Sequence, residues 1–531
     1  MPRINWRASW PLVLCVAAVT TSVVFSVRAS LAETHGRLVY AVDDAYIHMA
    51  VAKNLVRHGV WGCTPFHFSS SSSSPLWIVV LAAAYLAAGV RDYLPLILNT
   101  VFAALTLAVA DYYLRRFSVS VVARFAALIG IAVSSSMTAM VLIGMEHVVH
   151  LLLTIWFAGA AAEALTRQHD DGNVTSRREL IVLCILGGLL GSSRYEGFFL
   201  VAIVCLTFAA RGRFVAGSLI AAASWIPAGI FGVMSIWNGA FFLPNSLMLK
   251  AVGESSGLGS LLKPIGPGDI AFLRGHVNLL IVAGVAVAAA VAQAIAARTW
   301  RPAVLLPVWL LFAILLHGHF TFSSTYWAYR YDVYLLGFAI FTVAVAAAGL
   351  AARSVIADLV LSAALVAITA YLGDYRQGFF PQAEIAGAKY TGVEHVAIAK
   401  FVAAYYPDET IAINDLGALA YYTDARVLDI VGLGDLEPLL IQRRTGGYTR
   451  DDVREWVGAH HARIAILQVD WSLIIPIVPP QWREVSEIAL PPNGKRVGFF
   501  AIDPQEADRL HAVVAEYFGT WLRADGYRIR F

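Results

Sequence analysis

Apolar residues are gathered into long uncharged runs over the first 373 residues of the chain. Four runs come close to or exceed the roughly 20 residues that a helix needs to cross a bilayer. These are Ser9–Val27, Phe214–Leu249, Val277–Ala297 and Val333–Ala352. In all, twelve apolar segments can be distinguished, at 9–28, 75–90, 93–114, 119–141, 145–166, 180–193, 196–210, 214–238, 277–297, 302–316, 332–352 and 354–373. This pattern predicts a multi-pass α-helical membrane protein.

Arginines mark alternate connections between these segments, which is the pattern that the positive-inside rule uses to orient a membrane protein. The marked connections carry Arg3 and Arg7, Arg115 and Arg116, Arg167 with Arg177 and Arg178, Arg211 and Arg213, Arg298 and Arg301, and Arg353. We therefore expect these connections in the cytoplasm. The stretches expected outside are 30–74, 142–146, 193–197, 239–276, 317–331 and everything after about 374.

The number of crossings conflicts with this orientation in one place. Twelve full crossings from a cytoplasmic N-terminus would return the C-terminus to the cytoplasm. Either 75–90 or 93–114 is then a partial or re-entrant element, and the shorter 75–90 is the better candidate, which leaves about eleven spans. The first run, 9–28, also resembles a signal peptide, but it is longer than a usual one and many spans follow it, so we expect it to stay uncleaved.

The composition changes after residue 374, where charged residues become frequent and apolar runs shrink to strand length. Expected strands lie at 410–414, 427–431, 463–469 and 497–502, and expected amphipathic helices at 392–406, 450–459 and 504–524. This alternation predicts an extracytoplasmic α/β domain over 374–531, beside a transmembrane core over 1–373 that includes the outer loop 30–74.

Composition and charge support a membrane protein and exclude other classes. Hydrophobic residues make up 59% of the 531 residues and charged residues only 14%, against about a quarter in soluble domains. The net charge of +3 is scattered and forms no basic stripe, so we expect no nucleic-acid partner. Of the four cysteines, only Cys63 lies outside an apolar run and is expected to face water, so no structural disulfide is predicted. The serine run Ser69–Ser74 is expected to be a flexible lead into the next segment.

Two adjacent carboxylates, Asp43 and Asp44, stand in the first outer loop just beyond a predicted span. Acids near a low-dielectric surface are costly unless they are paired or used. Adjacent side chains point in different directions, so we expect one acid to face a substrate and the other to be anchored. If 44–58 is helical, His48 shares a face with Asp44. The alternative is structural, with one of the two acids capping the N-terminus of this helix.

Further ionisable residues occur in the other outer connections. Glu146 lies at the outer end of a span, and Arg194 and Glu196 separate two short apolar segments, where a local ion pair is the structural alternative. Asn245 follows Pro244 in a turn signal, and Lys250 comes shortly after; an isolated Lys at an interface can also simply extend its ammonium to water.

Trp327 and Arg330 belong to a stretch that is both aromatic and charged, Tyr326–Asp332, for which an interfacial aromatic belt is the structural alternative. Five outer connections thus each carry an acid, a base, or an amide with a base. Carboxylates for proton transfer, together with Lys or Arg for a phosphate, suit a reaction that deprotonates a hydroxyl and expels a phosphate at the membrane surface.

These motifs resemble the C superfamily of polytopic glycosyltransferases, which use polyprenyl-phosphate sugars. The resemblance rests on Asp-Asp-Ala-Tyr-Ile from Asp43, on His58-Gly59 and on Ser-Pro-Leu-Trp from Ser74. It is strongest to the terminal arabinofuranosyltransferases of mycobacterial cell-wall type and their uncharacterised bacterial relatives. Further matches are Gly144-Met145-Glu146, Arg194-Tyr195-Glu196-Gly197, Pro244-Asn245-Ser246 with Lys250, Asn414-Asp415-Leu416-Gly417-Ala418 and Leu428-Asp429-Ile430-Val431-Gly432-Leu433. Tyr195 and Ser246 depart from the Pro and Thr of those relatives.

The resemblance implies a glycosyltransferase core and an inverting transfer of a sugar, arabinofuranose by likeness only, to a cell-envelope glycan at the outer face of the bacterial cytoplasmic membrane. Asp44 would be the general base, with Asp43 as the alternative. Lys250, Arg194 or Arg330 would hold the departing polyprenyl phosphate. The resemblance also implies that the C-terminal domain clamps the acceptor. The remaining expected substrate-binding residues are His48, Glu146, Glu196, Asn245 and Trp327. No metal or other cofactor is predicted, since only some members of the superfamily use a divalent ion.

Two other functions fit parts of the pattern. A transporter or flippase of lipid-linked sugars would place ionisable residues near the middle of its spans, whereas here nearly all candidates lie at one face. A non-catalytic membrane protein whose outer domain binds glycan is the third possibility.

Overall fold

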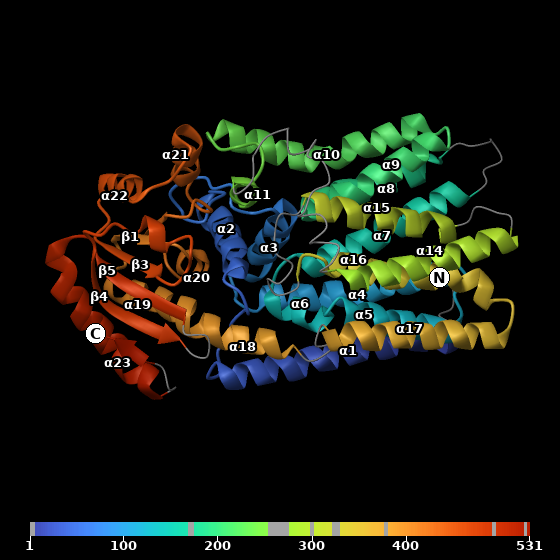
Figure 1. Cartoon of the computed structure of the whole chain (residues 1–531), viewed down its shortest axis with the longest axis horizontal. Coiled ribbons are helices and arrows are strands. Elements are labelled where there is room, and N and C mark those ends of the chain that lie inside the picture. Colours follow the sequence, from blue (N-terminus) through green and yellow to red (C-terminus); the bar gives the residue numbers. More distant parts are fainter. Residues whose placement is uncertain are drawn as a thin grey trace.

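The computed structural model describes residues 6–167, 175–252, 276–297, 302–320, 330–375, 381–490, 495–524 and 528–530. Long helices form a bundle, and a six-stranded sheet with its own helices stands at one end of it (Figure 1). The first helix, α1 (Trp6–Glu33), runs along the bundle and packs against α18 (Gln382–Thr391), the helix that leads into the sheet domain.

The bundle contains nine helical stretches that are long and apolar enough to cross a membrane, counted over the described residues. One of them is divided into α5 (Val121–Ser134) and α6 (Met137–Ile143) by a break at Ser135 and Ser136. The others are α1, α4 (Leu94–Arg116), α7 (His147–Thr166), α10 (Phe214–Trp237), α14 (Val277–Ala297), α15 (Pro302–Phe320), α16 (Val333–Ala351) and α17 (Val355–Tyr375).

The sequence predicted about eleven spans; nine helical stretches among the described residues have the length and apolarity of a span, and three other predicted segments form shorter helices. These are α3 (Pro75–Ala88), α8 (Arg177–Ser193) and α9 (Gly197–Ala210). The 14 residues of α3 or of α9 make a helix of about 21 Å, against a hydrocarbon core of about 30 Å. The expected partial crossing of 75–90 fits such a length and remains a prediction.

The burial of these helices follows their place in the bundle. The stretch that holds α5 and α6, together with α7 and α16, is mostly buried, whereas α10 and α17 expose apolar side chains over much of their length. Phe214, Ile230 and Trp237 of α10 and Val355 and Ile356 of α17 are among the exposed ones. An apolar surface of this extent is typical of contact with lipid.

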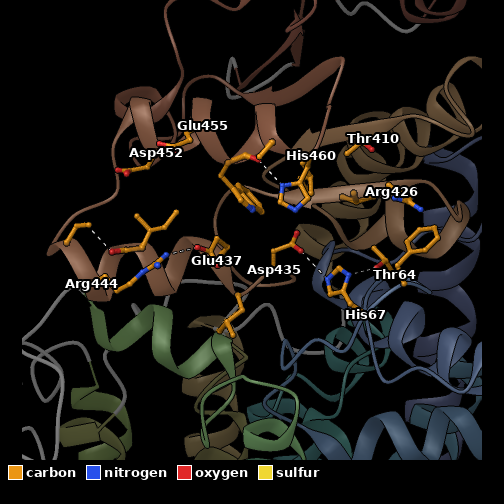
Figure 2. Close-up of a pocket in the computed structure, with 18 residues that line it drawn as sticks. Thr64, His67, Thr410, Arg426, Asp435, Glu437, Arg444, Asp452, Glu455 and His460 are labelled. Carbon is orange, nitrogen blue, oxygen red and sulfur yellow. Dashed lines mark hydrogen bonds and ion pairs between the residues drawn. The ribbon is translucent and has the colours of Figure 1, made fainter.

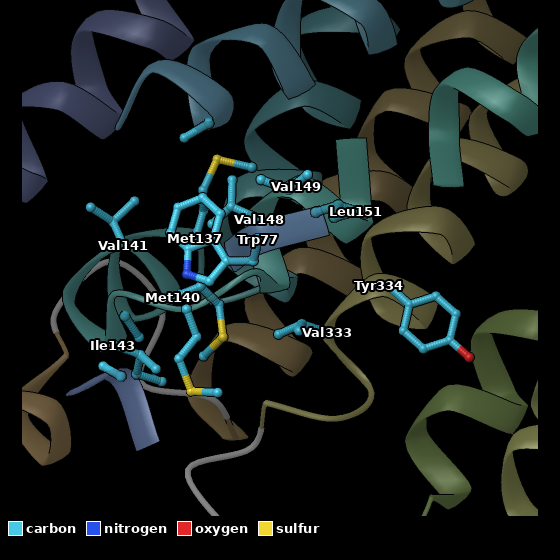
Figure 3. Close-up of a cluster of buried hydrophobic side chains, with 14 of the residues drawn as sticks. Trp77, Met137, Met140, Val141, Ile143, Val148, Val149, Leu151, Val333 and Tyr334 are labelled. Atoms are coloured by element: carbon cyan, nitrogen blue, oxygen red, sulfur yellow. The ribbon is translucent and has the colours of Figure 1, made fainter. Parts of the chain in front are cut away.

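A buried apolar cluster lies beside the loop that carries Glu146. It combines Trp77 of α3 with Met137 and Met140 of α6, Val148 of α7 and Val333 of α16 (Figure 3). The connection between α6 and α7 turns at Gly144, whose φ is +75° and where a Cβ would come within 2.4 Å of the Tyr40 ring. A glycine is therefore required here, and close packing on both sides holds the loop in place.

Several arginines of the predicted cytoplasmic connections lie close together. Arg116 and Arg167 both contact Glu163, and Arg167 also reaches Glu179. The connections after α4 and α7 therefore meet at one end of the bundle. That this end faces the cytoplasm remains a prediction.

The C-terminal sheet has the strand order β2-β1-β3-β5-β4-β6. The three strands β1 (Thr410–Ile413), β2 (Arg426–Asp429) and β3 (Ile464–Gln468) pair in parallel, and β3, β5 (Lys495–Ala501), β4 (Arg483–Leu490) and β6 (Arg528–Arg530) pair antiparallel. The expected strands correspond to β1, β2, β3 and β5. The polar sequence of β4 and the short β6 carry no clear apolar run, which is why neither strand was predicted.

The helices of this part are α18, α19 (Ala397–Tyr405), α20 (Gly417–Tyr422), α21 (Glu437–Thr445), α22 (Arg450–Ala459) and α23 (Ala507–Ala524), with a π-helical turn over Gly392–Val396. Short 3₁₀ turns occupy Ile475–Ile477 and Pro504–Glu506. The division of the chain at residue 373 remains a prediction; α17 ends at Tyr375 and the next described helix begins at Gln382.

The serine run is not a flexible lead, and Cys63 is not exposed. Five of the six serines of Ser69–Ser74 are buried, as is Cys63. Ser69 donates its main-chain N–H to Trp61 O at 2.9 Å, and Cys63 Sγ lies 3.2 Å from Ser71 Oγ. Small hydroxyl side chains suit this tight loop because they bond to one another and to nearby main chain. All four cysteines are free thiols.

The helix that follows the acidic pair, α2 (Asp44–His58), packs against α20 of the C-terminal domain. Buried Lys53 of α2 donates to the main-chain oxygens of Ala420, Tyr421 and Thr423 at 3.0 to 3.1 Å, and to Asp424 at 3.0 Å. The ammonium group thus satisfies the carbonyls at the C-terminus of α20. A positive charge there also interacts favourably with the negative end of the helix dipole.

We expect Lys53→Met to weaken this junction, because three carbonyl oxygens would lose a buried partner at a cost of about 1–3 kcal/mol. Heat-induced unfolding of the purified protein in detergent should shift to lower temperature, and protease cleavage between the bundle and the sheet domain should become faster. Lys389→Met is the matched control, because the pair of Lys389 with Glu33 is exposed and worth about 0–1 kcal/mol. Equal losses in both variants would contradict the assignment.

Candidate active site at the junction of the bundle and the C-terminal domain

The two acids of the first outer loop have different surroundings. Asp43 accepts hydrogen bonds from the main-chain N–H groups of Gly417 at 2.7 Å and Ala418 at 2.8 Å. It makes no side-chain cap for α2, whose first residue it precedes, so the simple capping alternative does not hold. A Cβ at Gly417 would lie 2.6 Å from the Asp43 carboxylate, so only glycine allows this approach. Asp43 is therefore anchored in the C-terminal domain.

Asp43 docks just beyond the carboxyl end of β1, where the order of the strands changes direction. Strand β1 lies between β2 and β3, so the chain leaves its carboxyl end toward β2 on one side and returns to β3 on the other. Asn414, which follows β1, accepts the N–H of Gln468 at the end of β3 at 2.8 Å. Open α/β sheets bind ligands in the crevice at such a point. Here the carboxylate of Asp43 enters it.

A cluster of titratable residues surrounds Asp43. His395 Nδ1 lies 3.7 Å from Asp43 Oδ1, and His395 Nε2 lies 3.3 Å from Glu394 Oε2. Burial opposes the charge of His395, but Glu394 and Asp43 outweigh it and raise its pKa to about 10. Burial raises the pKa of Asp415 to about 7, although His395 opposes this shift. His395 thus acts as a buried cation between the two parts of the chain.

Glu394, His395 and Asp415 are also the one group of three potential metal ligands that we find among the described residues, with ligand atoms within 4.8 Å of one another. A protonated imidazole is not a ligand, so at neutral pH the proton on His395 competes with any ion. We assign this cluster to charge balance around Asp43. The expectation of no obligatory metal remains a prediction.

Asp44 points to a different group, the guanidinium of Arg330, with which it forms an ion pair. The Asp44 side chain is 39% exposed, whereas Arg330 is buried. Arg330 also donates to Tyr331 Oη at 3.2 Å and to Met145 Sδ at 3.1 Å. Asp44 is therefore an accessible carboxylate held in position by a buried cation.

The ring of Tyr331 connects Arg330 to a second buried cation. The guanidinium carbons of Arg330 and Arg194 lie 5.1 and 5.3 Å from its centroid, within the range of cation–π contacts. Arg194 forms ion pairs with Glu146 at 2.6 Å and with Glu196 at 2.8 Å. Although burial opposes it, Arg194 holds the pKa of Glu196 well below its usual value. The local pair expected for Arg194 and Glu196 is thus part of a larger network.

The helical spacing had indicated that His48 lies beside the carboxylate of Asp44, but His48 does not pair with that carboxylate. Its Nδ1 contacts the main-chain oxygen of Asp44 at 3.1 Å, one turn back along α2, and its Nε2 lies 3.9 Å from Glu146. Burial lowers the pKa of His48, which favours the neutral ring. With Nδ1 donating to a carbonyl, Nε2 of the neutral ring is an acceptor.

The structure therefore brings Asp44, His48, Glu146, Arg194, Glu196 and Arg330 together. Asn245 has other contacts: its N–H donates to Ser70 O at 2.7 Å and its side chain to Leu433 O at 3.3 Å, which ties α11 (Asn245–Val252) to the C-terminal domain. The side chain of Lys250 and all of Trp327 lie outside the described residues.

Four residues that matter here were not predicted from the sequence. Tyr331 was grouped with an aromatic belt, although it lies between two arginines. His395 and Glu394 had no recognisable motif. Gly417 belongs to the Asn414–Ala418 match, which pointed to a turn in the outer domain, but nothing in that match indicated that Asp43 docks there. A sequence search for this site could look for an acid in the first loop together with an Asp-x-Gly turn far along the chain.

Comparisons with known proteins agree with this architecture. Residues 383–507 match a family described as "Domain of unknown function (DUF8728)". No curated protein sequence matches the chain.

Several solved structures have a similar fold. ArnT from Cupriavidus metallidurans, bound to undecaprenyl phosphate, has a TM-score of 0.56 and 13% identity over 94% of this chain and 99% of its own. The Archaeoglobus fulgidus oligosaccharyltransferase in its apo form has a TM-score of 0.54 and 12% identity over 94% of this chain and 75% of its own. AglB of that organism, with an inhibitory peptide and dolichol-phosphate, has a TM-score of 0.51 and 13% identity over 93% and 74%. The chain thus has the same overall fold as ArnT and the archaeal oligosaccharyltransferase. At these identities the likeness defines the fold alone.

We expect the stability of the junction to fall as the solution becomes alkaline. The pKa of His395 is raised on folding, from about 6.5 to about 10, so its stabilising contribution is complete below about pH 6.5 and is lost as the pH rises through about 10. Between about pH 7.5 and 9.5, the free energy of unfolding should decrease by up to about 1.4 kcal/mol per pH unit. Heat-induced unfolding in detergent at several pH values measures this slope.

His395→Gln should remove most of that pH dependence, whereas His58→Gln, a change at an exposed residue near the end of α2, should leave it unchanged. The same slope in the His395→Gln variant as in the unmodified protein would show that another group is responsible.

Proposed function

We propose that this chain is an inverting glycosyltransferase that moves a sugar from a polyprenyl-phosphate donor to a cell-envelope glycan, at the outer face of the bacterial cytoplasmic membrane. The observation that carries the proposal is the accessible carboxylate of Asp44, held by the buried cation Arg330 next to a second buried cation, Arg194. The fold supports it, since structural neighbours were solved with undecaprenyl phosphate and with dolichol-phosphate.

The proposed reaction follows from the chemistry of these groups. Asp44 accepts the proton of an acceptor hydroxyl as that oxygen attacks the anomeric carbon of the donor sugar. The bond between the anomeric carbon and the phosphate oxygen breaks on the opposite face, and the electron pair leaves with the polyprenyl phosphate. Because attack and departure take place on opposite faces of the anomeric carbon in a single displacement, its configuration is inverted. Arg330 holds the Asp44 carboxylate in position through their ion pair.

The leaving phosphate needs hydrogen-bond donors that are already in place. The Nε atoms of Arg194 and Arg330 are buried and have no hydrogen-bond partner among the described residues. A guanidinium is well suited to a phosphate because its planar donors match the phosphate oxygens. In this proposal Arg330, Arg194 and Lys250 bind the phosphate. Glu146, Glu196 and His48 position the two arginines and the start of α2, and Asn245 and Trp327 contact the substrate.

Asp43 has a different role in the proposal. Both of its oxygens accept main-chain N–H groups of the C-terminal domain, so a proton from the acceptor would have to displace one of these bonds. We therefore assign the general base to Asp44, and to Asp43 the positioning of α2 against that domain.

Transfer from a synthetic polyprenyl-phosphate arabinofuranose, and from hexose counterparts, should be detectable with the purified protein in lipid nanodiscs. Asp44→Asn should lower the rate roughly 10²- to 10⁴-fold, because it removes the general base. Asp43→Asn should mainly lower the melting temperature. Asp451→Asn, which changes an exposed carboxylate on α22, is the control and should leave the rate unchanged.

Transfer that is unaffected by Asp44→Asn, by Asp43→Asn and by both together would refute the catalytic assignment. Movement of the lipid-linked sugar across a membrane without transfer would favour a flippase instead.

The orientation has a test of its own. A reporter enzyme fused after residue 380 should be active only outside the cytoplasm, and one fused after Arg116 only inside. A cytoplasmic signal from the fusion at 380 would contradict the proposed location of the C-terminal domain.

A further inference from the structure

A large cavity lies against β2, the edge strand of the sheet, and the active-site network does not use it. It has a volume of about 1020 Å³. Its walls come from α21, α22 and β2, and Thr64, Phe66 and His67 of the first outer loop close one side (Figure 2). The cavity is therefore built by the C-terminal domain and the bundle together.

The side chains around this cavity combine aromatic rings with planar polar groups. Phe66 is 51% exposed, and the guanidinium of Arg426 lies over its ring at 5.0 Å. Trp456 of α22 also lines the cavity but is only 8% exposed. His67 Nε2 lies 3.1 Å from Asp435 Oδ1, which links the loop to the C-terminal domain across the cavity wall. Phe66 thus offers an aromatic face next to side chains that donate and accept hydrogen bonds.

The charges of the lining indicate what kind of ligand fits. The lining carries four carboxylates and two guanidiniums, and two of the carboxylates are paired with His67 and Arg444, so no excess of positive charge is left for a phosphate or another dense anion. The carboxylates are Asp435, Glu437, Asp452 and Glu455. A bound cation is also disfavoured, since the described residues bring three potential ligands together only at Glu394, His395 and Asp415, outside this cavity. A neutral ligand with many hydroxyl groups satisfies this lining.

We propose that this cavity binds a segment of a neutral oligosaccharide. The C–H face of a sugar ring packs on Phe66, and the sugar hydroxyls donate to the carboxylates and accept from Arg426 and Arg444. The identification of this oligosaccharide as the acceptor rests on the proposed function; its binding does not.

The separation between the cavity and Asp44 determines how long an acceptor must be to reach both. Asp44 begins α2, and the loop that closes the cavity follows the end of α2 at His58. The 15 residues of this helix extend about 22 Å. An acceptor that occupies the cavity and still presents a hydroxyl to Asp44 must therefore be an oligomer, whereas a monosaccharide can occupy only one of the two sites.

Binding is measured without donor, with the full-length protein in nanodiscs, by saturation-transfer NMR and titration calorimetry. The probes are mannotetraose, an α-1,5-linked arabinofuranosyl tetramer, inorganic phosphate and Mg²⁺. At least one tetrasaccharide should bind, and the two ions should not compete with it. Phe66→Ala and Glu455→Ala should each weaken binding about fivefold or more, the effect of one contact worth about 1 kcal/mol. Both residues are exposed, so neither change should unfold the domain.

Asp451→Ala and Arg454→Ala are the matched controls, because this exposed pair also lies on α22 but does not line the cavity. They should bind the tetrasaccharide like the unmodified protein. Failure of both tetrasaccharides to bind, displacement by phosphate, or unchanged binding by Phe66→Ala would overturn the proposal.

The same variants separate this proposal from the proposed function. Phe66→Ala should raise KM for a tetrasaccharide acceptor and leave KM for a monosaccharide acceptor unchanged. Tetrasaccharide binding without any transfer would count against the glycosyltransferase alone. Transfer that depends on Asp44 but responds equally to both acceptor lengths in Phe66→Ala would count against the cavity alone.

Discussion

Asp43, which precedes α2, and Lys53 of α2 hold the short helix α20 at its two ends, and the arrangement of the molecule depends on these two charges. Asp43 accepts the N–H groups of Gly417 and Ala418 at the start of α20, and Lys53 donates to three carbonyls at its end. Each charge meets the end of the helix dipole that attracts it. Because the groups are buried, losing either contact would leave polar main chain without partners. The outer loop and the C-terminal domain therefore behave as one unit.

This docking explains why two neighbouring acids have different surroundings. Asp43 is fixed by the main chain of the C-terminal domain, so the first residue of α2, Asp44, is directed toward Arg330. Arg330 and Arg194 are costly to bury and are stabilised by carboxylates and by the ring of Tyr331 between them. Because these ion pairs and ring contacts constrain one another, the side chains have few alternative conformations. The reactive carboxylate is therefore held accurately in position.

The first outer loop also connects the two sites described above. Its helix α2 has the proposed base at one end, and the loop beyond its other end closes the cavity on β2. The buried serine run continues the same path and is bonded to Asn245, whose side chain returns to the C-terminal domain. The proposed glycan site is thus attached to the proposed active site through well-packed structure.

The sequence by itself determined the class of fold, because spans and strands are local patterns of apolar residues that need no partner to be recognised. It also predicted that Asp44, Glu146, Arg194 and Arg330 lie in connections on one side of the membrane. Only the tertiary structure decided which of these residues meet, since their contacts join positions up to 286 residues apart. It likewise decided that Asp43 docks at Gly417 and that the serine run is buried. Contacts of this kind depend on how helices and sheet pack, and no local spacing in the chain encodes them.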